Sequence, residues 1–207
     1  MGKININLIM FIFSMLLTIW AANAKGNTLK KEESFLQKPC QEKYREKVAK
    51  LHFYVQDELR GPDATVWEVA RSKITSDSAT SFGLVRVMDD LITSDPAPNS
   101  KKLGRAQGLI TFSDLKESAL NMNINFYFTG GKYRGSTLCV LGRNPISNKI
   151  RELPVVGGTS TFRMARGYSI TNTYSYNTST DHGVLEYSIF VVYLEKKPCF
   201  EAAINDE

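Results

Sequence analysis

Apolar and polar side chains alternate along much of this chain, most regularly between Leu120 and Phe128. Every second residue there is Leu, Met, Ile or Phe, and three asparagines, Asn121, Asn123 and Asn125, stand between them. In an extended strand, a period of two places the apolar side chains on one face and the polar ones on the other. The segment therefore predicts a β-strand with one buried face.

Further segments show the same strand-like character, and turn signals such as Gly130-Gly131 and Asn144-Pro145 separate them. No sustained helical period follows Lys50. Many strands at short spacing predict an antiparallel sandwich or barrel, and the pattern leaves both open. The further predicted strands are Lys50–Gln56, Thr65–Ala70, Gly83–Asp89, Ala106–Ser113, Thr137–Leu141, Arg151–Val156, Phe162–Ser175 and Val184–Leu194.

The first 24 residues predict a cleaved signal peptide. Lys3 supplies a positive charge, Leu8–Trp20 is apolar apart from two hydroxyl residues, and Ala22-Asn23-Ala24 has the small-x-small form of a cleavage site. The alternative is a membrane anchor, but the run is shorter than the roughly 20 residues of a spanning helix. We expect a protein secreted to the extracellular space and not held in a membrane.

The rest of the chain has the length of one domain. We expect a polar N-terminal arm over 25–49, the strand-rich domain over 50–199 and a short tail over 200–207. The formal charge is +5, which favours retention on acidic cell-wall polysaccharide. Nucleic acid is not an expected partner, because no basic stripe interleaved with aromatic residues is present.

Few residues suit a metal or a modification. His52 and His182 have no Cys or His at ligand spacing, so no metal or other cofactor is expected. Cys139 lies in an apolar run and is expected to be a small buried residue. Asn177-Thr178-Ser179 is a sequon in a polar stretch between two predicted strands, so Asn177 is an expected glycosylation site.

Several blocks between Lys50 and Leu194 resemble the dirigent family of plants. The resemblance implies an eight-stranded antiparallel β-barrel of the allene oxide cyclase-like type, assembled as a homo-oligomer, with trimer and dimer both left open. It also implies a secreted protein that guides phenolic radicals or quinone methides to one stereoisomer. The blocks are FYVQDEL (53–59), FGLVRVMDDLIT (82–93), GRAQG (104–108), KYRGSTL (132–138), GRNP (142–145) and RELPVVGGTSTFRMARGY (151–168).

Other features follow from the same resemblance. A cysteine near each end of the domain is common in the family, which implies a disulfide between Cys40 and Cys199. Gly104, Gly108 and the Gly157-Gly158 pair are expected to mark tight bends of the closed sheet, where the missing Cβ is useful. Radicals would come from a separate laccase or oxidase.

The resemblance assigns the chemistry to two charged residues. Asp57 matches the family aspartate, and a carboxyl facing an apolar chamber can exchange a proton with a phenol or quinone methide. Arg151 matches the family arginine and can orient a phenolic oxygen. The alternatives are a turn-capping or ion-paired role for Asp57 and an ion pair with Glu152 or another acid for Arg151.

Three positions depart from the family pattern. Asn144 stands where lignan-forming members carry a second aspartate, and Ile110 stands where a tyrosine is usual. Gln56 replaces a frequent histidine, which changes the expected setting of Asp57. Phe112 and Thr173 match chamber-lining positions, although both could serve packing alone.

Asp89 and Asp90 form a tempting acid pair. Adjacent strand residues point to opposite faces, so the two cannot share one site within a regular strand. We interpret them as a turn at a strand end.

Three functional hypotheses follow. The first is a secreted dirigent protein that imposes stereochemistry on the coupling of monolignol radicals, such as those of coniferyl alcohol, to lignans. The second is a pterocarpan synthase-like enzyme that dehydrates and cyclises a hydroxylated isoflavonoid through a quinone methide, with Asp57 as general acid. The third is a non-catalytic phenolic-binding protein of the wall with a defence role, which the changes at Gln56, Ile110 and Asn144 favour.

Overall fold

The computed structural model describes residues 44–196. This part of the chain forms nine β-strands and two single-turn 3₁₀ helices. The strands are β1 (Tyr44–Glu58), β2 (Val66–Ala70), β3 (Val85–Thr93), β4 (Lys102–Phe112), β5 (Ala119–Phe128), β6 (Thr137–Pro145), β7 (Arg151–Thr159), β8 (Arg166–Asn177) and β9 (His182–Lys196); the turns are η1 (Thr75–Asp77) and η2 (Ser160–Phe162).

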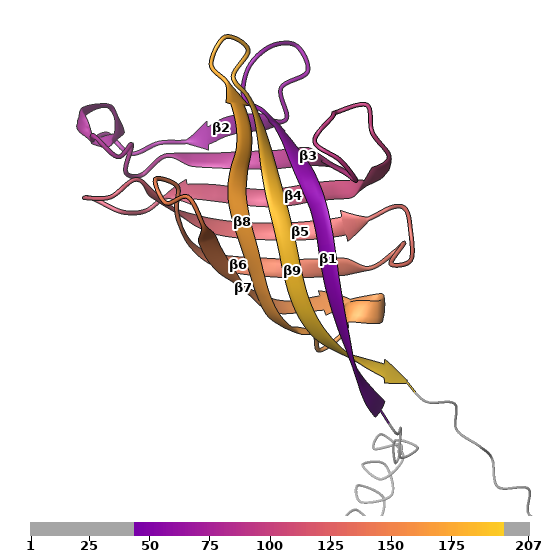
Figure 1. Cartoon of the computed structure of the whole chain (residues 1–207). Coiled ribbons are helices and arrows are strands. Elements are labelled where there is room, and N and C mark those ends of the chain that lie inside the picture. The colour runs from indigo at the N-terminus through magenta and orange to yellow at the C-terminus, as the bar shows by residue number, and fades with distance from the viewer. Residues whose placement is uncertain (1–43, 197–207) are drawn as a thin grey trace, which may run out of the picture. The chain divides into compact units, whose positions relative to one another are not determined.

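The strands form one antiparallel sheet in the order β1-β9-β8-β7-β6-β5-β4-β3-β2. A further pairing of β1 with β3, from Tyr54↔Thr93 to Gln56↔Leu91, closes eight of the strands into a barrel. β2 pairs with β3 at the edge of this closure (Figure 1). Closure leaves most strand edges paired, which removes the edges that an open sheet would expose. The predicted eight-stranded barrel is confirmed.

Several strand boundaries differ from the prediction, and the starts of β1 and β8 illustrate why. β1 begins at Tyr44, within the segment expected to be a polar arm, because its whole length pairs with β9. The predicted strand over 162–175 begins late, since η2 occupies its start and β8 runs from Arg166 to Asn177. The polarity of the local sequence does not indicate where β1 and β8 begin.

Aromatic side chains fill the end of the barrel opposite the loop between β1 and β2. The ring of Phe53 lies 5.1 Å from that of Phe126 and 5.8 Å from that of Tyr187, centroid to centroid. Phe162 and Tyr193 continue the cluster, with their rings 5.5 Å apart. Such offset and edge-to-face contacts give a rigid plug. Aromatic rings therefore occupy much of the interior at this end, although a smaller pocket of about 220 Å³ lies beside Phe53, Phe128 and Tyr133.

Two of the glycines expected at bends lie instead inside β4. A Cβ at Gly108 would lie 1.8 Å from the carbonyl oxygen of Asn123, and one at Gly104 would lie 2.0 Å from that of Tyr127. The neighbouring strand β5 therefore approaches β4 more closely than a side chain allows. These glycines permit the tight coiling of a closed sheet.

Several predictions fall outside residues 44–196. The signal peptide, both cysteines of the implied disulfide and the C-terminal tail are among them. The strands that lead toward Cys40 and Cys199 are paired up to Tyr44↔Lys196. Within the described range, no helix is long and apolar enough to cross a membrane.

Candidate active site: an acid pair in the barrel chamber

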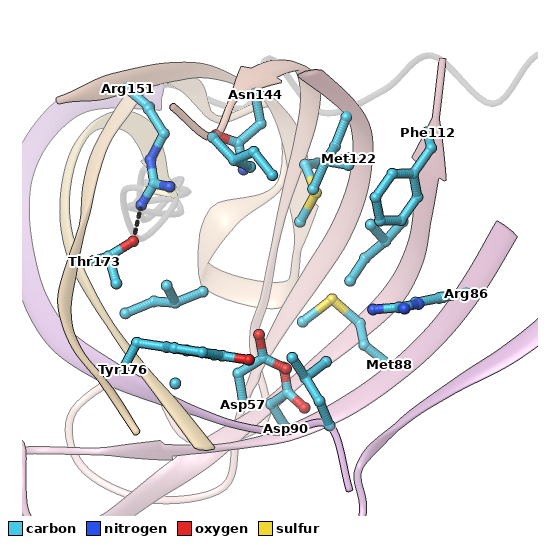
Figure 2. Close-up of a pocket in the computed structure, with 16 residues that line it drawn as sticks. Asp57, Arg86, Met88, Asp90, Phe112, Met122, Asn144, Arg151, Thr173 and Tyr176 are labelled. Atoms are coloured by element: carbon cyan, nitrogen blue, oxygen red, sulfur yellow. Dashed lines mark hydrogen bonds between the residues drawn. The ribbon is translucent and has the colours of Figure 1, made fainter. Parts of the chain in front are cut away.

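A cavity of about 310 Å³ occupies the hollow end of the barrel. Its size is within the range of small-molecule sites. Most of its wall is apolar, and a few polar groups from β1, β3, β6, β7 and β8 point into it (Figure 2). The lining residues are Asp57, Leu59, Arg86, Met88, Asp90, Ile110, Phe112, Leu120, Met122, Asn144, Ile146, Arg151, Thr173, Tyr176, Gly183 and Leu185.

The cavity brings together every chamber residue that the sequence predicted. Asp57 and Arg151 line it, and the four expected binding residues do so as well: Ile110, Phe112, Asn144 and Thr173. They come from five strands, β1, β4, β6, β7 and β8, and are separated by up to 116 positions along the chain, counted from 57 to 173. Closure of the barrel is what makes them neighbours.

Asp90 joins Asp57 in the chamber, contrary to the interpretation of Asp89 and Asp90 as a turn. Both lie within β3, where Asp89 faces outward to Arg105 and Asp90 is fully buried. The pairing of β1 with β3 ends at Gln56↔Leu91, so the next positions along the two strands are Asp57 and Asp90. Figure 2 shows their carboxyl groups side by side on one wall.

The two carboxyls have raised pKa values. Burial raises the pKa of Asp57 to about 6, against the opposing effect of the positive charges of Arg86 and His182. Burial and then the negative charge of Asp57 raise the pKa of Asp90 to about 8. Two carboxylates in such proximity do not readily ionise together. Near neutral pH the pair holds one proton, chiefly on Asp90, which gives the chamber an acid beside a base.

A hydrogen bond holds Asp90 in place, but the hydrogen-bonding capacity of the two carboxyls is not fully used. Thr65 donates its hydroxyl to Oδ1 of Asp90 at 2.5 Å. Oδ2 of Asp90 and Oδ1 of Asp57 are buried and have no hydrogen-bond partner among residues 44–196. Buried polar atoms are rarely left unpaired, and an exception calls for an explanation. A ligand in the cavity would supply the missing partners.

The opposite wall holds Arg151 and Asn144. Arg151 donates from Nη2 to the hydroxyl of Thr173 at 3.1 Å, and burial lowers its pKa. No carboxylate pairs with Arg151 in the described part of the chain, and Glu152 lies on the exposed face. Nε of Arg151 and Oδ1 of Asn144 are also buried without a partner there. The alternative role for Arg151, an ion pair with Glu152, is therefore not found among residues 44–196, and both groups are free to bind a ligand.

Gln56 does not belong to the chamber. Its side chain points away from Asp57 and donates to the hydroxyl of Thr93 at 2.9 Å and to the carbonyl of Pro96 at 3.1 Å. The amide oxygen of Gln56, Oε1, lies 3.1 Å from Nε2 of His182. A positive neighbour for Asp57 comes from His182 instead of position 56, because its charge lowers the pKa of Asp57.

Ile110 leaves an apolar wall where the family pattern has a phenol. A phenolic side chain is still present in the cavity wall, because Tyr176 of β8 lines the cavity. The hydroxyl of Tyr176 donates to Asp181 at 2.9 Å, and this bond raises the pKa of Tyr176. Tyr176 thus stands at the mouth of the chamber.

Three lining residues with ionisable side chains escaped the sequence analysis of the site: Arg86, Asp90 and Tyr176. Alternation along β3 places Arg86, Met88 and Asp90 on one face, so the strand signal could have found two of them. Tyr176 could not have been found this way. An irregularity in the β8–β9 register between Thr173 and Ser175 shifts the alternation and turns Tyr176 inward.

Two predicted features lie away from the chamber. Cys139 is on the outer face and only partly buried, so the expectation of a buried residue is wrong; its thiol lies 3.2 Å from Oδ1 of Asn125. Asn177 is exposed at the end of β8, and its Oδ1 accepts from the backbone N–H of Ser179 at 2.9 Å. Glycosylation of Asn177 stays a prediction. Residues 44–196 hold no cluster of three or more potential metal ligands.

Comparison with known proteins places this barrel among characterised relatives. The family model for Dirigent-like protein matches residues 48–192. Dirigent protein 21 of Arabidopsis thaliana is 37% identical over 180 residues, which span 86% of this chain and 95% of that protein. Pterocarpan synthase 1 of Glycyrrhiza echinata is 40% identical over 149 residues, or 72% of this chain and 79% of that protein.

Solved structures agree with this relationship. The structure of the pterocarpan synthase dirigent protein GePTS1 superposes with a TM-score of 0.68 at 38% identity and covers 76% of this chain and 90% of that one. That of PsPTS1 gives a TM-score of 0.66 at 40% identity and covers 74% of this chain and 97% of that one.

Proposed function

Because this chain belongs to the dirigent family, we propose that its chamber closes a ring stereoselectively on a phenolic quinone methide. Asp57 and Asp90 exchange the protons, and Arg151 with Asn144 orients the phenolic end. The observation that supports this function is the buried pair of carboxyls with unpaired oxygens facing the cavity. The substrate is a phenol that carries a benzylic hydroxyl and a second, nucleophilic hydroxyl, as in a hydroxylated isoflavonoid.

The first step is loss of water. Protonated Asp90 gives its proton to the benzylic hydroxyl, the C–O bond breaks, and water leaves. The electron pair comes from the phenol at the far end of the ring, whose oxygen is held by the N–H groups of Arg151. That oxygen releases its proton to water at the chamber mouth, and the neutral quinone methide results.

The second step is ring closure. The nucleophilic hydroxyl adds to the methide carbon, a C–O bond forms, and the proton of that hydroxyl passes to the Asp57 carboxylate. The phenolic oxygen takes a proton back from water as the ring becomes aromatic again. Transfer of the proton from Asp57 to Asp90 restores the pair, so the net change is loss of one water, with no oxidant or reductant consumed.

Selectivity comes from orientation. Apolar side chains from β3, β4 and β5, among them Met88, Ile110 and Met122, form the wall against which the ring system packs. Holding the nucleophile on one face of the methide makes the attack effectively unimolecular, which contributes far more than the difference needed to select one enantiomer.

Oxidant-free turnover tests this function. The protein expressed from the full chain is incubated with a racemic hydroxylated isoflavonoid alcohol and no oxidant, and the products are separated on a chiral column. We expect accelerated formation of one enantiomer of the cyclised product compared with buffer. A racemic product formed at the rate of the buffer control would contradict the proposal.

A second candidate is stereoselective coupling of monolignol radicals supplied by a separate laccase or oxidase. Its support is the set of relatives named dirigent proteins. Coniferyl alcohol with a one-electron oxidant is the probe, and an enantiomeric excess of lignans that is absent without the protein would favour this route. Tight binding of phenols without a change in any product would favour the binding-only role in the wall.

We also propose that copies of the chain assemble through the outer face of the barrel. The strand registers place Trp67, Val87, Leu109, Asn123 and Leu141 in one row across β2 to β6. The four apolar members of this row are exposed. An exposed row with apolar side chains at four of its five positions supports an interface on this face.

Replacing Leu109 with glutamate should dissociate this assembly. A charge at the centre of an apolar interface must lose its water without gaining a partner, so we expect a monomer at concentrations where the wild type is an oligomer. Sedimentation velocity measures the change. Leu115→Glu, at an exposed loop position between β4 and β5, is the control and should leave the oligomer intact; an oligomer that persists in Leu109→Glu would place the interface elsewhere.

A further inference from the structure

Arg86 is a charged chamber residue that the proposed mechanism does not use. It lies on β3, lines the cavity, and carries its guanidinium carbon 5.4 Å from the centroid of the Phe112 ring. This cation–π contact fixes the direction of the side chain at the edge of the cavity. Figure 2 shows its guanidinium pointing into the chamber from the side opposite Arg151.

The acidic neighbour of Arg86 is engaged elsewhere. Glu68 is its partner across β2 and β3. Both carboxylate oxygens of Glu68 instead accept hydrogen bonds from Arg71, from Nε and from Nη2. No ion pair or hydrogen bond of the Arg86 side chain is found among residues 44–196. Its donors therefore remain available to a ligand.

Two arginines and two aspartates line the chamber. Arg86 and Arg151 contribute two positive charges. Asp57 and Asp90 share one proton near neutral pH and contribute one negative charge. The remaining wall is largely apolar, where an uncompensated charge interacts strongly with a mobile ion or a charged ligand. A negatively charged group on a ligand would therefore be attracted to the free donors of Arg86.

We propose that Arg86 binds a carboxylate on the substrate, so that the preferred substrates are phenolic acids in their anionic form. A guanidinium presents its N–H groups in a fork that matches a carboxylate, and such charge-assisted pairs are strong where water is excluded. The phenolic oxygen would lie at Arg151 and the carboxylate at Arg86. The middle of the molecule would then face Asp57 and Asp90, which lie on the lower wall of the chamber in Figure 2, with Arg151 at the upper left and Arg86 at the right.

This inference rests on the proposed function for the placement of the phenol, but its test needs no turnover. Ferulate and coniferyl alcohol share a methoxyphenol ring and differ in the carboxylate. Their dissociation constants are measured by isothermal titration calorimetry at pH 7 and low salt with the protein from the full chain. We expect ferulate to bind about tenfold more tightly, in line with a charge-assisted hydrogen bond, and high salt to reduce the difference.

Arg86→Gln should remove the preference for ferulate and leave the affinity for coniferyl alcohol nearly unchanged. Arg86→Lys should retain part of the preference, which separates loss of charge from loss of packing on Phe112. Arg105→Gln is the matched control, because Arg105 lies on the outer face in an ion pair with Asp89, and it should keep the preference.

Equal affinities of the wild type for the two ligands would overturn the proposal, as would a preference that survives in Arg86→Gln. If Arg86→Gln does not fold, the salt dependence of binding to the wild type provides the test. A preference for ferulate that high salt does not reduce would then contradict the proposal. Oxidant-free cyclisation of a neutral isoflavonoid alcohol would persist even if this inference fails, so the two failures are distinguishable.

Discussion

Replacing Asp57 with asparagine is expected to lower kcat/KM for ring closure by about 10²–10⁴-fold, the usual contribution of a positioned acid or base. The change removes the carboxylate that takes the proton of the attacking hydroxyl. Asparagine has nearly the same shape and cannot accept a proton at accessible pH. Rates are measured under the oxidant-free conditions described above, and the product is expected to lose part of its enantiomeric excess.

The matched control is Asp89→Asn, one position from Asp90 and on the outer face of the same strand. Its carboxylate pairs with Arg105 and does not reach the chamber, so this variant should keep the wild-type rate. Coniferyl alcohol should still bind to Asp57→Asn, because the apolar walls and Arg151 are unchanged. A fully active Asp57→Asn protein would remove Asp57 from the mechanism.

Replacing Asp90 with asparagine should have an equally large effect on rate and the opposite effect on stability. The wild-type kcat/KM should follow a bell-shaped curve, because Asp57 must be ionised and Asp90 protonated. The pair titrates with apparent pKa values of about 6 and about 8, so activity should fall below and above this window. Asp90→Asn should be about 10²-fold or more slower throughout, since the proton donor is absent.

The stability effect follows from the direction of the pKa shift. The pKa of Asp90 is about 8 in the folded protein, compared with an ordinary value of 3.8. Between these values the folded state binds more protons than the unfolded state, so stability falls as pH rises. Asparagine does not ionise, so the variant does not lose stability in this way as pH rises. Its side-chain oxygen can still accept the hydrogen bond from Thr65. The Tm of Asp90→Asn should exceed that of the wild type at pH 8 by on the order of 5 °C.

The difference in Tm should shrink at pH 5, where Asp90 is protonated in the wild type as well. Differential scanning calorimetry at the two pH values provides the comparison, with Asp89→Asn again as the control. A Tm difference that does not change with pH would show that Asp90 is not a buried acid with a raised pKa.

Much of the barrel could be predicted because alternation is a local signal. The period of two in Leu120–Phe128 directly marks which side chains of β5 face the core, and turn residues mark where strands end. The barrel closure is not local. It depends on three pairs between β1 and β3, and only the resemblance to the dirigent family distinguished barrel from sandwich.

Chamber residues could be predicted where they lie in family motifs. Those whose inward direction depends on strand geometry could not. Asp57 and Arg151 lie in blocks shared with the family and line the cavity as expected. Asp90 was missed because β3 continues to Thr93, which turns an apparent turn residue into an interior one. Tyr176 was missed because a single irregularity in β8 reverses the face of every later residue.

The most direct test of the acid pair needs neither substrate nor turnover. Carbon-13 NMR of the side-chain carboxyls of aspartate, assigned with Asp57→Asn and Asp90→Asn, follows both groups as the pH is changed. We expect the two carboxyls to titrate together, with apparent pKa values of about 6 and about 8. If both carboxyls titrate near the ordinary value of 3.8, the chamber holds no shared proton and the proposed mechanism fails.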